Sequence, residues 1–111
     1  MVEKLSASEF YEALKNLSGW KEDKEGKAIT KTYIFPTFAE AFSFMTRIAL
    51  FVEKTNHHPE WTNIYNKVQV TLETHECGGV SVKDIALAVH MEEAAFAFLN
   101  PCTSDQTSLI F

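Results

Sequence analysis

Apolar residues recur at helical spacing in three stretches of the chain, and each stretch begins with a residue that can cap a helix. The capping residues are Ser6, Thr37 and Ser81, each followed three positions later by an acidic residue, which is the pattern of a capping box. The three helices are therefore expected over residues 7–17, 38–54 and 82–99. The Asn100-Pro101 pair should end the last of them.

Strand-forming residues fill the two gaps between these helices. The segment from Trp20 to Phe35 is predicted to form a hairpin around a Lys24-Glu25-Gly26 turn, because its second arm is rich in β-branched and aromatic residues. A second hairpin is expected from Ile64-Tyr65, through a turn at Asn66-Lys67, to an arm at 68–74 in which apolar and polar residues alternate. The order α-β-β-α-β-β-α predicts an α+β fold with three helices packed on one face of a four-stranded antiparallel sheet.

The middle and last expected helices carry more apolar residues than packing on a sheet requires. In the middle helix one stripe contains Phe38, Ala41, Phe42, Met45, Ala49 and Val52, and another contains Phe44, Ile48 and Phe51. The last helix has Ile85, Val89 and Phe96 on one side and Leu87, Met91 and Phe98 on another. Two interpretations stay open: helices sunk deep in their own core, or a helical interface with other copies or a partner.

Composition narrows the class of protein. The chain has 111 residues, enough for one domain, which we expect over 1–100 with a C-terminal tail at 101–111. Its formal charge of −5 argues against direct nucleic-acid binding. Its apolar runs are too short for a membrane span. Cys77 and Cys102 do not form a C-x-x-C pair, so we expect free thiols and a soluble, intracellular protein.

Four histidines are present, and three of them lie close together in the sequence. The His57-His58-Pro59 segment lies between an expected helix and an expected strand, where functional loops are common. His75 follows the second arm of the second hairpin, so antiparallel pairing should return it toward that loop. The fourth, His90, lies within the last helix and is interpreted as an ordinary, partly buried histidine.

Three histidines in one pocket suggest two kinds of chemistry. Imidazole can give and take protons near neutral pH, which suits general acid–base catalysis. It is also a common metal ligand. The spacing lacks H-x-H and H-x-x-x-H, and adjacent histidines do not easily point the same way, so we expect no metal. The absence of any site is the third alternative.

Other residues near this cluster have structural explanations as well. Asp84 fits the acidic position of a capping box, and Trp61 could be either a core residue or a wall on which a flat ring stacks. Glu53 lies near the C-terminal end of the middle helix, where an acidic side chain is mildly unfavourable. A functional role for it beside the His57-His58 pair is therefore an alternative. Cys77 could be a nucleophile only if His75 served as its base.

At these residues the sequence resembles the pterin-4a-carbinolamine dehydratase family, whose animal members are also dimerization cofactors of a hepatocyte nuclear factor. The resemblance covers about Leu5 to Phe98. The family pattern is an acid, a His-His-Pro segment, an aromatic residue, a later histidine and an aspartate. Here these are Glu53, His57-His58-Pro59, Tyr65, His75 and Asp84.

The resemblance implies dehydration of 4a-hydroxytetrahydrobiopterin to the quinonoid dihydropterin during recycling of the pterin cofactor. It implies a catalytic set of His57, His58 and His75, with the first and last handling protons and His58 positioning the pterin. No redox cofactor is expected, since two acid–base groups suffice for loss of water. Besides the histidines, the expected substrate-binding residues are Asn56, Pro59, Trp61, Glu73, Thr74 and Glu76. Glu53 and Asp84 are expected to support the site.

The resemblance also bears on partners and location. It implies a homodimer or homotetramer that buries the middle helix, and a cytoplasmic protein. Animal members of the family also act as transcriptional coactivators that bind a transcription factor's dimerization helices. That second role would imply a nuclear location and a protein partner.

Overall fold

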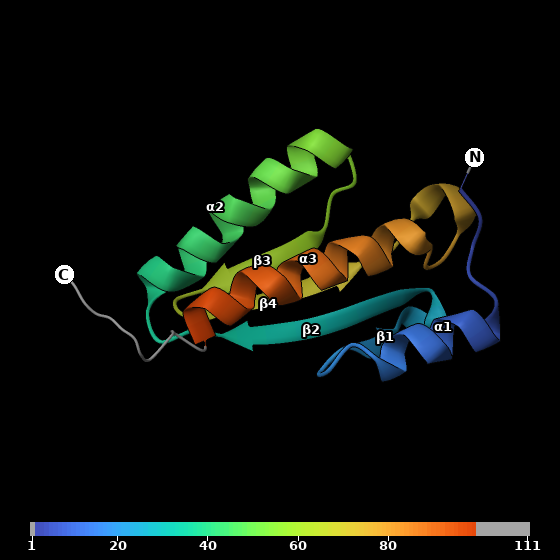
Figure 1. Cartoon of the computed structure of the whole chain (residues 1–111), viewed down its shortest axis with the longest axis horizontal. Coiled ribbons are helices and arrows are strands. Elements are labelled where there is room, and N and C mark those ends of the chain that lie inside the picture. Colours follow the sequence, from blue (N-terminus) through green and yellow to red (C-terminus); the bar gives the residue numbers. More distant parts are fainter. Residues whose placement is uncertain (1, 100–111) are drawn as a thin grey trace.

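The computed structural model describes residues 2–99, which contain three α-helices and one four-stranded sheet in the expected α-β-β-α-β-β-α order (Figure 1). The helices are α1 (Ala7–Lys15), α2 (Phe38–Thr55) and α3 (Val82–Leu99). The strands are β1 (Lys21–Asp23), β2 (Ala28–Ile34), β3 (Glu60–Ile64) and β4 (Lys67–Leu72). Two 3-10 turns, η1 (Lys24–Gly26) and η2 (His75–Cys77), follow β1 and β4. The predicted tail at 101–111, including Cys102, lies outside the described residues.

Local capping explains where the helices begin. Ser6 and Glu9 form both hydrogen bonds of the predicted capping box at α1. At α2 the Thr37 side chain accepts from the N–H of Glu40, as predicted, but the Thr37 hydroxyl also donates to the Glu40 carboxylate at 3.1 Å. These contacts satisfy backbone donors that a helix start leaves free.

The sheet is antiparallel throughout, in the order β1-β2-β4-β3. The second hairpin starts earlier than predicted, because β3 begins at Glu60 and ends at Ile64, and the turn is formed by Tyr65 and Asn66 rather than by Asn66 and Lys67. Tyr65 has a positive φ of 52°, which belongs to a turn. The Asn63 side chain braces this turn by donating to the carbonyls of Tyr65 and Lys67 at 3.0 and 2.9 Å.

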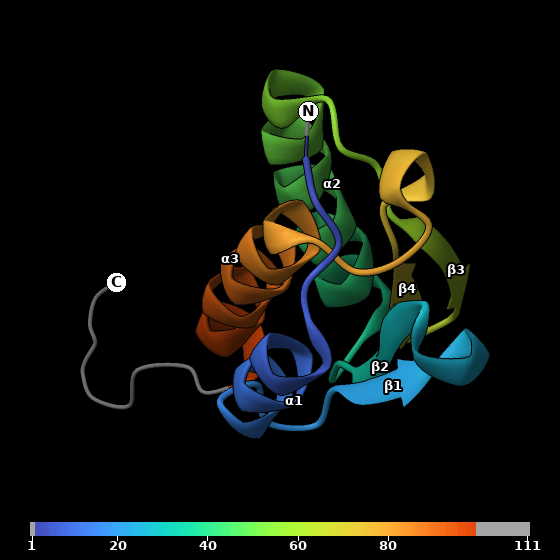
Figure 2. The ribbon, with the colours of Figure 1, turned by 90° about the vertical axis from the view of Figure 1, so that its right-hand side faces the viewer.

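One face of the sheet forms the core, and the opposite face is largely polar. The buried strand residues of the core face are Ile29, Tyr33, Val68, Val70 and Leu72, and Ala28 and Thr71 are buried on the opposite face. Residues from α2 and α3 join them in one hydrophobic cluster, which also includes Phe10 of α1. The end-on view shows the helices gathered on the same side of the sheet (Figure 2). None of the described helices combines the length and apolar character needed to cross a membrane.

The buried face of α2 cuts across both predicted stripes. Its buried residues are Ala41, Phe44, Ile48 and Val52, which follow one another at intervals of three or four. Phe38, Phe42 and Leu50 remain exposed. On α3, Leu87 and Met91 are buried while Val89 and Phe96 are exposed. The single chain therefore buries only part of the apolar surface of these helices.

A polar cluster, not anticipated from the sequence, ties α3 to the sheet away from the histidines. One oxygen of Glu92 accepts from the indole N–H of Trp20 at 3.1 Å, from the Lys31 ammonium at 2.6 Å and from the Tyr33 hydroxyl. Burial and the adjacent Glu92 carboxylate raise the pKa of Tyr33 above its ordinary value. We call these four residues the Glu92 cluster.

Candidate active site

The loop between α2 and β3 carries His57 and His58. Asn56 caps the C-terminus of α2: its left-handed backbone (φ 55°, ψ 39°) turns the chain, and its N–H donates to the carbonyl of Val52 at 2.7 Å. Asparagine tolerates this conformation better than most residues. Pro59 keeps the residue before it out of helical geometry. The helix therefore stops directly before the first histidine.

His57 reaches inward from this loop to a carboxylate on α3. Its Nε2 lies 2.6 Å from Oδ1 of Asp84, and its side chain is only 13% exposed. Asp84 is fully buried. A buried carboxylate is tolerated only where hydrogen-bond donors surround it, so the surroundings of Asp84 decide what this pair can do.

The second carboxylate oxygen of Asp84 is held by two residues from outside the body of α3. Oδ2 accepts from the hydroxyl of Thr74 at 2.7 Å and from the N–H of Ser81 at 2.9 Å. The hydroxyls of Thr74 and Ser81 lie 2.7 Å apart, and Ser81 Oγ accepts from the N–H of Lys83 at 3.2 Å. Asp84 thus takes the acidic capping position predicted for it and also holds His57.

These contacts bear on which nitrogen of the His57 ring carries the proton. The N–H of Ser81 can only donate, and the Thr74 hydroxyl donates as well, so Oδ2 of Asp84 acts as the acceptor of both bonds. Beside an ionised carboxylate, Nε2 of His57 would carry the hydrogen, because otherwise two acceptors would face each other at 2.6 Å. In that tautomer Nδ1 is the nitrogen that can accept a proton.

His75 lies on the turn that follows β4. Thr74 forms a bridge with Gly79, and its carbonyl accepts from the N–H groups of Cys77 and Gly78 at 3.2 and 3.1 Å. The His75 side chain is 76% exposed, and its Nδ1 lies 3.7 Å from Oε2 of Glu73. Thr74 therefore connects the two histidine environments, since its backbone shapes the His75 turn and its hydroxyl holds the partner of His57.

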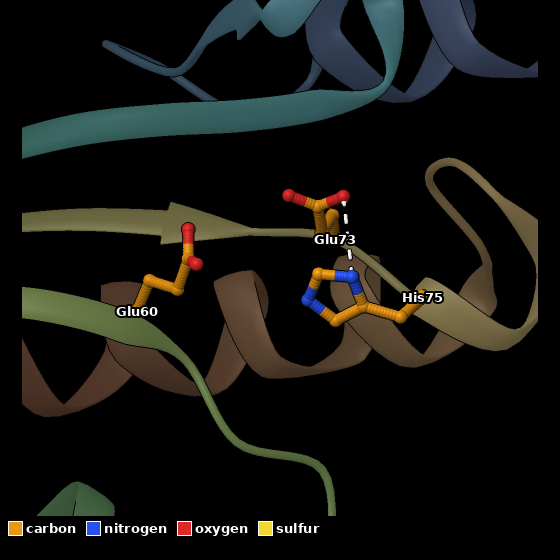
Figure 3. A group of neighbouring side chains, drawn as sticks. All are labelled: Glu60, Glu73 and His75. Carbon is orange, nitrogen blue, oxygen red and sulfur yellow. Dashed lines mark ion pairs between the residues drawn. The ribbon is translucent and has the colours of Figure 1, made fainter.

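The carboxylates of Glu60 and Glu73 lie beside His75 (Figure 3). The Lys24 ammonium of η1 is 2.5 Å from Oε1 of Glu73 and 3.0 Å from Oε1 of Glu60. Glu73 and Glu60 raise the pKa of Lys24 above its ordinary value. Potential ligand atoms of Glu60, Glu73 and His75 lie within 4.8 Å of one another. Because the Lys24 ammonium bridges the two carboxylates, this group already holds a cation and is not assigned as a metal centre.

Glu60 also connects the two histidine-bearing segments. It begins β3, three residues after His57, and its carboxylate lies within 4.8 Å of a ligand atom of His75. The return of His75 toward the His57 loop, which was inferred from antiparallel pairing, therefore occurs. A shallow hollow opens beside this point, lined by Pro59, Glu60, Trp61, Thr62, Gln69 and Thr71.

The remaining predicted residues have varied surroundings. His58 is exposed, with Nε2 3.4 Å from Oδ1 of Asn56. Trp61 is partly buried against the hydrophobic core. Glu53 is exposed near the end of α2, and Glu76 is exposed with an oxygen 3.5 Å from the Lys83 ammonium.

Two side chains have contacts that favour a structural role. The Cys77 thiol lies 3.5 Å from the carbonyl of Thr74 and 3.7 Å from that of Gly79, and it does not contact His75. His90 stacks on Phe51 of α2 with 3.8 Å between ring centroids.

Sequence reasoning missed the contributions of Lys24 and Ser81 to this site. Lys24 was interpreted as part of a hairpin turn, and Ser81 only as a helix cap. A lysine at the first position of a turn has no local signal that predicts which strands its side chain will reach. The reciprocal capping pattern at Ser81 and Asp84 was visible, but its connection to His57 depends on tertiary contacts.

The sequence model of the family described as pterin 4 alpha carbinolamine dehydratase matches residues 3–94. The chain belongs to the pterin-4a-carbinolamine dehydratase family. A relative from Bradyrhizobium sp. (strain ORS 278) that carries the pterin-4-alpha-carbinolamine dehydratase name is 53% identical over 97 residues, covering 87% of this chain and 97% of the relative. One from Rhizobium meliloti with the same name is 52% identical, covering 84% and 89%.

Solved structures agree with this family assignment. A transcriptional coactivator/pterin dehydratase from Brucella melitensis is 46% identical, with a TM-score of 0.81, covering 84% of this chain and 99% of that one. A pterin dehydratase-like RuBisCO assembly factor of the alpha-carboxysome is 23% identical, with a TM-score of 0.60 over 69% of this chain and 89% of that one. The second likeness concerns the fold alone.

Proposed function

We propose that this protein dehydrates 4a-hydroxytetrahydrobiopterin to the quinonoid dihydropterin by histidine acid–base catalysis. The observation that carries the proposal is the His57–Asp84 pair, in which a buried carboxylate 2.6 Å from Nε2 holds one ring nitrogen and leaves Nδ1 free. Family membership supports the substrate class, since the named relatives are hydro-lyases acting on the pterin carbinolamine.

The reaction requires two proton transfers and no change of oxidation state. The C4a–O bond breaks as the leaving hydroxyl takes up a proton and departs as water, and N5 loses a proton as its electron pair forms the new C=N bond. General acid and base groups on either side of the ring would accelerate both steps. A hydro-lyase reaction of this kind balances without an oxidant or reductant.

His57 suits one of these transfers because its orientation is fixed. With Nε2 donating to Asp84, Nδ1 can accept a proton, and the adjacent carboxylate stabilises the imidazolium that forms. His75 suits the other transfer because its ring is open to a bound molecule and has Glu73 beside it. Which histidine acts as the acid is left to the kinetic experiment.

The remaining predicted residues would bind the pterin. His58, exposed beside Asn56, would position the ring, and Pro59 and Trp61 line the hollow next to Glu60. Glu76 and the segment Glu73-Thr74 would offer polar groups to the pyrimidine edge. The Thr74 side chain is engaged with Asp84, so its backbone is the part that we assign to substrate.

Stopped-flow measurement of 4a-hydroxypterin dehydration tests this proposal. Wild type should accelerate the reaction, and His57→Ala and His75→Ala should each lower kcat by about a hundredfold or more. His90→Phe is a matched control, because an aromatic ring at this position can still stack on Phe51, outside the site. Unchanged rates in both alanine variants, with the folded state retained, would remove the catalytic assignment.

A second candidate function is a protein-interaction module, either a homo-oligomer or a coactivator-type complex. The exposed apolar residues Phe38, Phe42 and Leu50 on α2, with Val89 and Phe96 on α3, favour it. The Brucella melitensis relative is described both as a coactivator and as a pterin dehydratase. Analytical ultracentrifugation of wild type and Phe42→Ser tests the oligomer, and a wild type that stays monomeric at high concentration would contradict it.

A further inference from the structure

We propose that Lys24 is a positioning residue that fixes the separation between the His75 turn and the His57 loop. The inference rests on the proposed dehydratase function and adds a residue from a distant part of the chain. Lys24 does not touch either imidazole in the described contacts. It contacts one carboxylate next to each histidine-bearing segment.

The first support is the geometry of the bridge. Nζ of Lys24 is 2.5 Å from Glu73, which lies directly after β4, and 3.0 Å from Glu60, the first residue of β3. The Glu73 side chain is only 12% exposed, so its carboxylate has lost most of its water and depends on this ammonium. One cation therefore joins the two strand ends from which the histidines project.

The backbone around Lys24 is the second support. Lys24, Glu25 and Gly26 have φ values of 50°, 56° and 86°, so three successive residues adopt the left-handed conformation. Only the last is a glycine, and side-chain-bearing residues rarely adopt this region. Such a turn persists only where surrounding contacts hold it, and the two carboxylates supply those contacts.

The orientation of Glu73 is the third support (Figure 3). Lys24 engages Oε1, while Oε2 faces Nδ1 of His75 at 3.7 Å. By fixing one oxygen, the ammonium directs the other toward the imidazole. A single exposed ion pair contributes little to structure, but an ammonium shared by two carboxylates, one of them mostly buried, restricts three side chains together.

The consequence for the reaction is geometric. Loss of water needs one group near the leaving hydroxyl and another near N5 at the same time, and small displacements of either group slow such a step strongly. Sheet pairing holds β3 to β4 as far as Glu60 and Thr71. Beyond that pair, loss of the bridge frees the Glu73 carboxylate that lies beside His75. The effect should therefore be larger on kcat than on KM, because binding of the ring depends on fewer contacts than its alignment does.

The experiment compares Lys24→Met, Lys24→Arg and the control Lys27→Met in the stopped-flow dehydration assay. Lys27 belongs to the same turn and is exposed, with no ion pair among the described residues. We expect about a tenfold lower kcat for Lys24→Met with a smaller change in KM, recovery of most of that loss in Lys24→Arg, and wild-type rates for Lys27→Met.

Glu60→Gln provides a second route if Lys24→Met folds poorly. It removes one anchor of the bridge and should lower kcat in the same way, and the double variant Lys24→Arg with Glu60→Gln should lose the recovery. Equal kcat in wild type, Lys24→Met and Glu60→Gln would overturn the role of Lys24 while leaving the dehydratase function standing. A wild type that fails to accelerate dehydration would instead overturn the proposed function, and this role with it.

Discussion

Two carboxylates of α3 face the interior of the molecule about two helical turns apart, and their surroundings differ in kind. Asp84 is fully buried and is held by an imidazole, a hydroxyl and a backbone N–H. Glu92 is partly exposed and is held by an indole, a phenol and the ammonium of Lys31. Both are satisfied, but only Glu92 has a partner that is permanently charged near neutral pH.

Under the proposed function, this difference separates a proton-transfer site from a structural contact. Glu92 has a lysine ammonium among its partners and lies away from the histidine-bearing segments, so its cluster is interpreted as structural. At Asp84 the partner that can carry positive charge is His57, which does so only when it takes up a proton. The carboxylate of Asp84 therefore faces a titratable ring on the loop after α2, whereas the Glu92 cluster connects α3 to β2 and to the end of the α1–β1 connection.

The largest effect is expected for Asp84→Asn, which replaces the carboxylate beside His57 with a neutral amide. The Ser81 N–H and Thr74 hydroxyl would hold the amide oxygen, so the amide N–H₂ would face Nε2 of His57 and move the ring proton to Nδ1. We expect kcat to fall by more than about a hundredfold with the fold retained, as measured by stopped flow and circular dichroism. A rate within a few-fold of wild type would show that Asp84 does not determine a catalytically important tautomer of His57.

Thr74→Val tests whether the hydrogen bond from Thr74 to Asp84 contributes to the activity. Valine preserves the shape of the side chain but removes the hydroxyl that donates to Asp84 at 2.7 Å. We expect about a tenfold lower kcat, with recovery in Thr74→Ser, because outer hydrogen-bond partners tune such sites by about this factor. If valine and serine variants behave alike, the hydroxyl has no part in positioning His57.

Glu92→Gln tests whether Glu92, unlike Asp84, contributes to stability rather than to catalysis. The charge-assisted bonds from Lys31 and Tyr33 weaken, so the free energy of unfolding should fall by about 1–2 kcal/mol, the lower end of the usual range because the carboxylate is partly exposed. kcat should stay within about twofold of wild type. Urea unfolding measures the stability, and the dehydration assay measures kcat. A large loss of kcat without loss of stability would contradict the structural role of Glu92.

The smallest expected effect concerns pH. Burial and Glu92 raise the pKa of Tyr33 in the folded protein above its unfolded value of about 10. Above that pH the unfolded chain releases a proton that the folded chain keeps, so stability should fall as pH rises. Between about pH 9 and about pH 11 the loss should be steeper in wild type than in Tyr33→Phe in urea unfolding. If stability falls equally with pH in wild type and in Tyr33→Phe, the pKa of Tyr33 is not raised by its burial and its contact with Glu92.

The sequence predicted those features that depend on local chemistry. Ser6, Thr37 and Ser81 located the helix starts because a cap and its partner are neighbours in the chain. The start of β3 at Glu60 was missed, because Pro59 and the polar residues of β3 weaken its strand signal. That strand is recognisable mainly from its register with β4, which is a tertiary property.

The candidate site was predictable as a set of residues but not as a set of contacts. His57, His75 and Asp84 were identified from clustering and family resemblance. The contact between His57 and Asp84 joins a loop to a helix far along the chain, and the sequence held no signal for it. The reach of Lys24 depends on a left-handed turn, and the inward direction of Lys31 depends on its place in β2.

The most direct test is the tautomer of His57, measured from the ¹⁵N shifts of its ring nitrogens by NMR at a pH where the ring is neutral. We expect a protonated Nε2 and a bare Nδ1 in wild type, with the reverse in Asp84→Asn. A wild-type ring protonated on Nδ1, or an unchanged tautomer in the variant, would contradict the claim that the buried carboxylate prepares His57 for proton transfer.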